Sequence, residues 1–248
     1  MSIVSRGFKI FWWLIKFAFV ALIAFVCGFL LWRVFSSATP KTMETISVND
    51  AVYEAYEEDG ELFAFYQKQA TITRAEKNAG YFSVAHTAII PEANQIQVVL
   101  RYNNSTIRRL TEDKALNETP QRDEDLFDIS LFCTVDLTPD NTEDNAELSD
   151  EGTRTFRVSS EQVAKEEKNL YNYRKFVFDF DECGEDIEEL IDSGLLLAVY
   201  ADVYYVEDMN FEEEAYGTLC LYDYKTKKEE IKISSKDIEA IEGWKHEE

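Results

Sequence analysis

The chain offers few of the side chains that most often carry acid–base catalysis. It has two histidines, and histidine is the commonest catalytic base because its pKa lies near neutrality. His246 belongs to the C-terminal tail, and His86 alternates with Phe82, Val84 and Ala88, which predicts a structural histidine in a strand. The sequence contains no HExxH, paired CxxC, GxSxG, P-loop or GxGxxG pattern. It therefore points to no catalytic, cofactor-binding or metal-ligating residue, and it implies no cofactor.

Carboxylates are abundant, with 48 Asp and Glu in 248 residues. A glycoside hydrolase needs two carboxylates at a defined separation, and so many candidates single out no pair. Calcium needs about six to eight converging oxygen ligands, and Asp140–Asn145 lacks the glycine and the spaced glutamate of an EF-hand loop. Solvated acidic loops are the leading interpretation of four stretches: Asp123–Asp128, Asp140–Glu151, Asp181–Asp192 and Glu207–Glu214.

Aromatic and basic side chains add little evidence for a binding function. Carbohydrate-binding domains use exposed aromatic platforms, but only Trp244 of the four tryptophans lies outside the N-terminal apolar run. Tyr204, Tyr205 and Tyr216 are possible substitutes, although strand tyrosines usually pack across strands. One basic concentration is predicted to neutralise neighbouring acidic loops rather than to receive an acidic partner: Arg74, Arg101, Arg108, Arg109 and Arg122.

The charge is divided unevenly along the chain. Residues 1–40 contain four basic residues and no acidic one, whereas the remainder has 21 Lys and Arg against 48 Asp and Glu, a formal charge of −27. An anionic field of this size repels the phosphates of nucleic acids and favours cations and basic partners. Nucleic-acid binding is therefore not expected.

The residues from Ile10 to Trp32 are apolar except for Lys16. In a helix they span roughly 30 Å, the thickness of a bilayer hydrocarbon core. Trp12, Trp13 and Trp32 lie at the two ends, where tryptophan prefers the head-group layer, and Lys16 is close enough to the first end to extend its ammonium there. The sequence predicts a transmembrane helix over residues 10–33, with the lipid bilayer as its partner.

The basic residues set the expected orientation. Arg6, Lys9 and Lys16 outweigh Arg33 and Lys41, so the positive-inside rule predicts a cytoplasmic tail over residues 1–9 and an extracytoplasmic C-terminal domain at the cell membrane. A signal sequence cleaved after Ala38 is the alternative. The length of the apolar run and the position of Arg33 favour an uncleaved anchor.

Residues 34–60 are predicted to form a polar tether and a short helix capped by Ser47 and ended by Gly60, which either packs on the domain or stands as a stalk. Residues 61–248 change to a period of two, typical of strands with one face on a core and one in water. In Gln95–Asn103, for example, Ile96, Val98 and Leu100 are expected to face the core and Gln95 and Gln97 to face water. Leu195–Val206 is apolar on both faces and suits a central strand. The other expected strands are Tyr81–Ile90, Gln95–Asn103, Phe127–Val135, Gly152–Val158, Phe176–Phe180, Gly217–Tyr224 and Glu229–Ser234.

The order of these elements predicts the fold class. Strands without a regular βαβ rhythm indicate a mainly β, antiparallel β-sandwich, immunoglobulin-like or jelly-roll-like, with a few short helices. The last two strands flank Lys225–Lys228, which is predicted to be a hairpin loop. The expected helices are Ser160–Asn169, Glu185–Asp192 and Lys236–Ile241.

Three cysteines lie beyond the apolar run, so the chain is no disulfide scaffold. Cys133 and Cys220 fall within strands and are candidates for a bond between two sheets, although a small buried hydrophobe is the commoner role; Cys183 is the third. Asn104-Ser-Thr and Asn117-Glu-Thr match the glycosylation pattern, which also arises by chance.

At Pro91–Thr106, Asp136–Asn145 and Glu213–Tyr224 the chain resembles a group of uncharacterised bacterial membrane-anchored proteins. This resemblance implies a bacterial cell-surface location and lends no activity. The expected function is a non-catalytic, membrane-anchored domain that binds a protein partner or supports an envelope complex. The alternatives are a surface glycan hydrolase and a carbohydrate- or calcium-binding sensor.

Overall fold

The computed structural model describes residues 3–65, 81–136, 152–168, 170–211, 214–224 and 230–244. The chain divides into two units, one of Met1–Ala38 with Lys168–Leu170 and one of Thr39–Glu167 with Tyr171–Glu248. Several residues considered above lie outside the described part: Arg74, Asp140–Asn145, Lys225–Lys228 and His246.

The first unit is dominated by the helix α1 (Ile3–Ser37). Between Trp12 and Arg33 it is long and apolar enough to span a membrane. Its large apolar side chains from Trp12 to Trp32 are between 43% and 71% exposed. Exposed apolar area on this scale is unfavourable in water, because burial of each square ångström stabilises by roughly 25 cal/mol.

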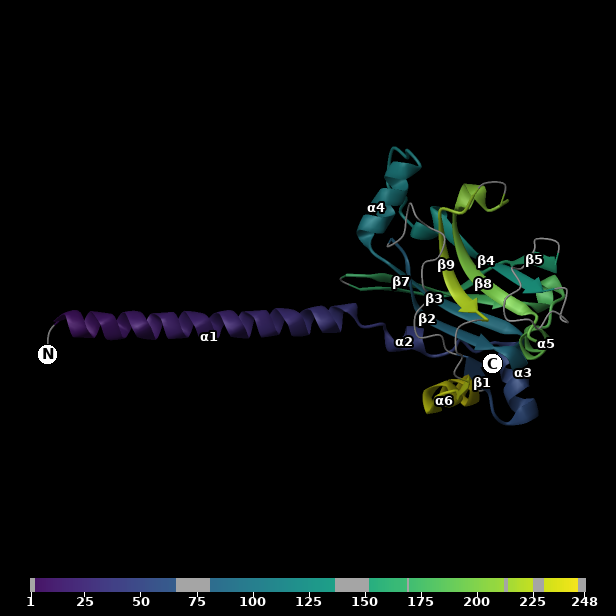
Figure 1. The fold of residues 1–248 in the computed structure, drawn as a ribbon, viewed down its shortest axis with the longest axis horizontal. Coiled ribbons are helices and arrows are strands. Elements are labelled where there is room, and N and C mark those ends of the chain that lie inside the picture. The colour runs from purple at the N-terminus through teal and green to yellow at the C-terminus, as the bar shows by residue number, and fades with distance from the viewer. Residues whose placement is uncertain are drawn as a thin grey trace. The chain divides into compact units, whose positions relative to one another are not determined.

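The second unit contains two antiparallel sheets (Figure 1), which confirms a mainly β domain. The strand order is β10-β1-β2-β3-β7-β6 in the six-stranded sheet and β5-β4-β8-β9 in the four-stranded sheet. The strands are β1 (Phe63–Phe65), β2 (Ser83–Ile90), β3 (Gln95–Tyr102), β4 (Phe127–Asp136), β5 (Thr153–Val158), β6 (Glu161–Glu167), β7 (Asn172–Asp179), β8 (Leu196–Tyr205), β9 (Gly217–Asp223) and β10 (Glu230–Lys232).

The main core lies between the two sheets and follows the period of two. Ile96, Val98 and Leu100 on β3 are fully buried and belong to one hydrophobic cluster with residues of β4 and β8. The strand β8 has β4 on one side and β9 on the other, as its apolar sequence predicts. Alternation thus correctly identified the inward-facing residues of the longer strands.

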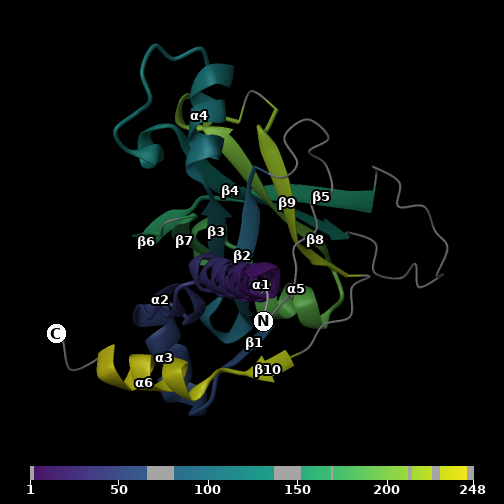
Figure 2. The same cartoon turned by 90° about the vertical axis from the view of Figure 1, so that its left-hand side faces the viewer.

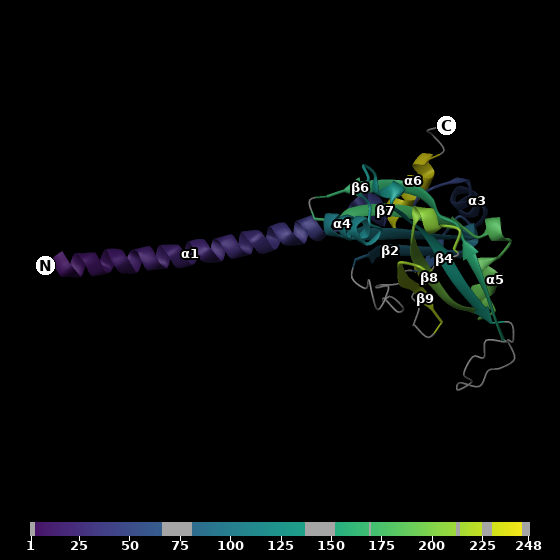
Figure 3. The ribbon, with the colours of Figure 1, turned by 90° about the horizontal axis from the view of Figure 1, so that it is seen from above.

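The second face of the six-stranded sheet is also covered, which the sequence did not indicate. Gln95 and Gln97 were expected to face water, but they are only 0% and 2% exposed. Their face is covered by α2 (Lys41–Glu44), α3 (Asp50–Asp59) and α6 (Ser235–Trp244), and by Ile46 and Val48 of the intervening chain. Figures 2 and 3 show α3 and α6 together on the side of this sheet away from β8 and β9.

The helix α3 packs on the domain, because Val52 is fully buried. Its N-cap is Asn49 rather than Ser47: the Asn49 Oδ1 accepts a hydrogen bond of 3.1 Å from the Val52 N–H. Ser47 instead exchanges two hydrogen bonds with Gln97. The helix ends as predicted at Gly60, whose φ of +69° lies in the left-handed region that glycine adopts most easily.

Two local predictions were wrong. Residues 160–169 were expected to form a helix, but Glu161–Glu167 is the strand β6, paired with β7 and bulged between Gln162 and Ala164. The strands β9 and β10 were expected to form a hairpin, but β10 pairs with β1 in the other sheet, with Phe63 opposite Lys232. In both cases a partner distant in sequence decides the structure, and local patterns do not record it.

The remaining helices lie at the ends of strands. The helix α4 (Asn104–Asp113) follows β3 and was not expected; it has a capping box between Asn103 and Thr106. The helix α5 (Ile187–Asp192) falls where a helix was expected and is capped by Asp186. Short 3₁₀ turns are η1 (Pro91–Ala93), η2 (Asp123–Asp125), η4 (Asp181–Cys183) and η5 (Val206–Asp208).

Candidate functional site

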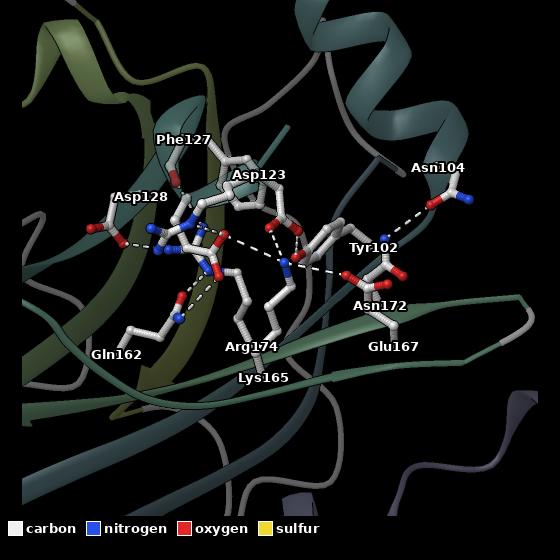
Figure 4. Close-up of polar contacts among 12 residues, drawn as sticks. Tyr102, Asn104, Asp123, Phe127, Asp128, Gln162, Lys165, Glu167, Asn172 and Arg174 are labelled. Carbon is white, nitrogen blue, oxygen red and sulfur yellow. Dashed lines mark hydrogen bonds and ion pairs between the residues drawn. The ribbon is translucent and has the colours of Figure 1, made fainter. Parts of the chain in front are cut away.

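A cluster of charged and polar side chains joins the two sheets (Figure 4). The six-stranded sheet contributes Tyr102 from β3, Lys165 from β6 and Arg174 from β7. Asp123 from η2 and Asp128 from β4 lie opposite. We call these five residues the ionic cluster. It brings acidic, basic and phenolic side chains close together, so the contacts and protonation states of these side chains indicate whether the cluster could be catalytic.

Arg174 is the most deeply buried member, with 1% of its surface exposed. Its Nη1 donates to the Phe127 carbonyl at 2.7 Å, its Nε donates to the Gln162 Oε1, and its Nη2 lies 3.4 Å from the Asp128 carboxylate. The guanidinium carbon lies 4.8 Å from the ring centres of both Phe127 and Phe176. Every face of this guanidinium is thus in contact with protein groups.

The Asp123 carboxylate joins the other members. One oxygen accepts from the Tyr102 hydroxyl, and the other accepts from the Lys165 Nζ at 2.5 Å. Lys165 also lies 3.4 Å from the Glu124 carboxylate and 3.3 Å from that of Glu167. Because Tyr102 and Lys165 come from different strands, Asp123 fastens η2 to two strands of the six-stranded sheet.

The protonation states favour a structural cluster. Burial, reinforced by the hydrogen bond to Asp123, raises the pKa of Tyr102 far above its ordinary value, so the phenol stays protonated. Burial opposes the charge on Lys165, but the hydrogen bond and charge of Asp123, together with Glu124 and Glu167, outweigh burial and raise the pKa of Lys165. Burial raises the pKa of Asp128, and the charge of Arg174 acts against that rise. A general base or acid works best with a pKa near the operating pH, which neither Tyr102 nor Lys165 has.

His86 lies on β2, on the opposite face of the six-stranded sheet from the ionic cluster. It is half-buried, and burial lowers its pKa. The positive charge of Lys175 lowers it further, and the charge of Asp237 acts in the opposite direction. His86 lies in a strand as expected, but the bulge between Val84 and His86 turns its side chain to the face opposite that of Val84.

Three of the four described arginines of the basic concentration have acidic neighbours. Arg109 lies 3.2 Å from Asp113, and Arg108 and Arg122 lie 3.7 and 3.8 Å from Glu112 and Glu124. Arg101 lies over the Tyr171 ring. These contacts agree with neutralisation of the domain's own carboxylates.

The aromatic candidates are engaged within the domain. Tyr204 is 2% exposed and packs against Phe211, and the rings of Tyr205 and Tyr216 contact each other at 5.2 Å. Trp244 in α6 packs against Tyr53 of α3 at 5.4 Å. Each of these four rings therefore contacts another aromatic ring of the domain.

The cysteines and possible metal ligands form no site within the described residues. Cys133 and Cys220 are both free and buried and belong to the same four-stranded sheet, so the candidate bond between sheets does not form. Cys183 is free as well. In the described ranges no group of three or more His, Cys, Asp or Glu side chains is placed to hold a metal ion.

A second candidate is an acidic surface built from two helices. Residues 42–67 and 176–224 contain no lysine or arginine. They include α3 and α5, and both helices contact η1. We call the exposed carboxylates of this region the acidic surface: Asp50, Glu54, Glu57, Glu58, Asp181, Glu182, Asp186, Glu188 and Glu189. The nearby Glu185 is paired with Arg154, whose two terminal nitrogens lie 2.5 and 2.7 Å from its oxygens.

The ionic cluster was not predicted from the sequence, although one signal was present. Arg174 stands two residues before Phe176 and four before Phe178, so it shares their inward face in the period of two. A charged residue on an apolar face is unusual because its burial requires compensating partners. No local pattern identifies those partners, because Asp123 and Asp128 lie about 50 residues earlier in the chain.

No known protein family matches the sequence, no curated protein matches it, and no solved structure matches the fold. The resemblance of three segments to uncharacterised bacterial membrane-anchored proteins therefore stays a prediction.

Proposed function

We propose that the chain is a single-pass membrane protein whose C-terminal part is an extracytoplasmic, antiparallel β-sandwich that binds a basic protein partner without catalysing a reaction. The observation that carries the proposal is α1, which exposes its apolar side chains along a membrane-spanning length. The excess of basic residues before the helix supports a cytoplasmic N-terminus.

The contacts of the domain support binding rather than catalysis. The charged groups of the ionic cluster form hydrogen bonds and ion pairs within the domain. The acidic surface, by contrast, presents carboxylates to solvent on two helices that contact the same turn. A surface of one sign raises the association rate of an oppositely charged partner, and the effect falls with ionic strength.

Alkaline carbonate extraction of cell membranes tests the anchor. The intact chain is expected in the membrane pellet. A variant with Val20→Asp and Ile23→Asp is expected in the soluble fraction or degraded, because each charge at the helix centre costs about 2.5–3.5 kcal/mol of insertion free energy. The matched control carries Val20→Leu and Ile23→Leu and should pellet. An intact chain released by carbonate would contradict the proposal.

Cross-linking in cells, followed by purification from detergent-solubilised membranes, tests partner binding. A variant with glutamine at Glu54, Glu58, Glu188 and Glu189 is expected to lose the cross-linked partner. The control carries the same charge change at exposed positions elsewhere: Glu118, Glu161, Glu239 and Glu242. A partner lost equally from both variants, or no partner at all, would contradict the acidic surface as the binding site.

A further inference from the structure

The segment between α1 and α3 is fastened to the domain. Residues 40–48, which we call the strap, lie on the outer face of the six-stranded sheet, where Met43 and Ile46 are 2% and 4% exposed. Met43 packs against Val99 of β3 and Tyr173 of β7. The polar composition of this segment predicted a tether, but its two largest apolar side chains are buried in the domain.

Three buried polar side chains hold the backbone of the strap. The Lys175 Nζ donates to the carbonyls of Thr42 and Thr45 at 3.2 and 2.5 Å. The Asp237 Oδ1 accepts from the Ile46 N–H at 2.8 Å. Gln97 accepts from the Ser47 N–H at 2.6 Å and donates to its carbonyl at 2.8 Å. Because these anchors bind main-chain groups, they act together only when the strap is docked.

Two basic side chains and one acidic side chain lie beside the strap. Lys175 and Asp237 are each 3% exposed, and both act electrostatically on the half-buried His86. On β3, Val99 lies directly opposite both His86 and Lys175 and carries no charge, and the strap's own Lys41 and Glu44 are exposed. Among the described groups that act electrostatically on His86, one carboxylate therefore faces one ammonium, so a proton on the imidazole leaves an excess positive charge.

We propose that the strap is an acid-released element: protonation of His86 beside Lys175 undocks residues 40–48 from the outer face of the six-stranded sheet. The contacts involved all lie within the second unit, so the proposal does not depend on membrane insertion or on a partner. If α1 is a membrane anchor, release lengthens the connection between the anchor and the domain.

The direction of the pH effect follows from the protonation equilibria. Burial and Lys175 lower the pKa of His86 below 6.5 in the docked state. An undocked, solvated His86 regains its ordinary pKa and therefore binds a proton at a higher pH, so acidification favours the undocked state. Burial also lowers the pKa of Lys175 to about 8, and Asp237 opposes this. Lys175 is therefore already charged at neutral pH, and His86 is the group that changes.

The test compares two adjacent strap positions in the full chain in detergent micelles. Met43 is buried and Glu44 is exposed, so Met43→Cys reacts with a methanethiosulfonate reagent only after release, whereas Glu44→Cys reacts in both states. Peptide mass spectrometry measures both reaction rates, and the Met43→Cys rate is divided by the Glu44→Cys rate. Because both rates contain the same pH dependence of the thiol reaction, this dependence cancels in the ratio. Between about pH 7.5 and about pH 5 the ratio is expected to rise about tenfold for each unit by which docking lowers the His86 pKa.

Two histidine variants distinguish release of the strap from general unfolding in acid. His86→Gln is expected to give a ratio that does not change with pH, and the control His246→Gln to keep the acid response. A constant ratio in the parent chain, or an acid response that persists in His86→Gln, would overturn the proposal. If Met43→Cys prevents folding, hydrogen exchange of the peptide covering residues 40–48 in the natural chain, corrected for intrinsic exchange, decides between the same outcomes.

Discussion

Replacing Arg174 tests the structural role of the ionic cluster. Arg174→Ala removes a guanidinium that is 1% exposed, leaves the Phe127 carbonyl without its 2.7 Å donor, and leaves Asp128 without its cation. Breaking a buried ion pair costs about 3–5 kcal/mol because the remaining charge is uncompensated. Asp128 keeps part of its solvent contact, so we expect the domain to lose about 3 kcal/mol, with a further loss from the cavity beside Phe127 and Phe176.

Arg174→Met provides the matched comparison. Methionine retains apolar contact with both rings but leaves the Phe127 carbonyl and Asp128 unpaired as alanine does, so its expected cost is about 3 kcal/mol without the further loss from the cavity. Urea unfolding of the full chain in micelles, followed by near-ultraviolet circular dichroism, measures both free energies. The reasoning fails if Arg174→Ala stays within about 1 kcal/mol of the parent chain, or if Arg174→Met is the more damaging change.

Three further outcomes follow from the same contacts. Tyr102→Phe removes one donor to Asp123 while Lys165 remains, and urea unfolding should show a loss of about 1 kcal/mol. Gly60→Ala should lower the free energy of unfolding by about 1 kcal/mol, because φ is +69° there, and Gly217→Ala, where φ is not positive, should cost less. Unfolding measured against pH should show stability rising above about pH 8 and falling from about pH 9: Lys175 has a pKa of about 8 folded against 10.5 unfolded, whereas burial raises the pKa values of the Cys133 and Cys220 thiols above 9.0 and that of Tyr205 from 10.0 to about 12. Lys175→Met should remove the rise.

The strands were predictable because their signal is local. In Gln95–Tyr102 and Phe127–Asp136 every second residue is apolar, and these residues face the same side of the strand. The alternating pattern alone therefore locates the core between the sheets. The end of α3 was predictable for a similar reason, since a glycine after a helical pattern supplies the left-handed cap.

The errors arose where distant segments decide the structure. Residues 161–167 are rich in helix-forming Glu, Gln, Ala and Lys, yet pairing with β7 makes them a strand. Gln97 was assigned to water because nothing near it in sequence covers it, but Ser47, 50 residues earlier, binds its side chain. The ionic cluster was missed for the same reason, because its acids and bases come from separate elements.

The pairing of β1 with β10 determines when the domain can be completed during synthesis. Phe63 lies opposite Lys232, and the shared cluster beneath them also requires Ile233 and Ile241. The strand β1 must therefore wait for β10 and α6 before it has both of its neighbours, and closing that long loop is entropically slow. Removal of α6 should therefore prevent completion of this edge of the sheet rather than merely shorten the protein.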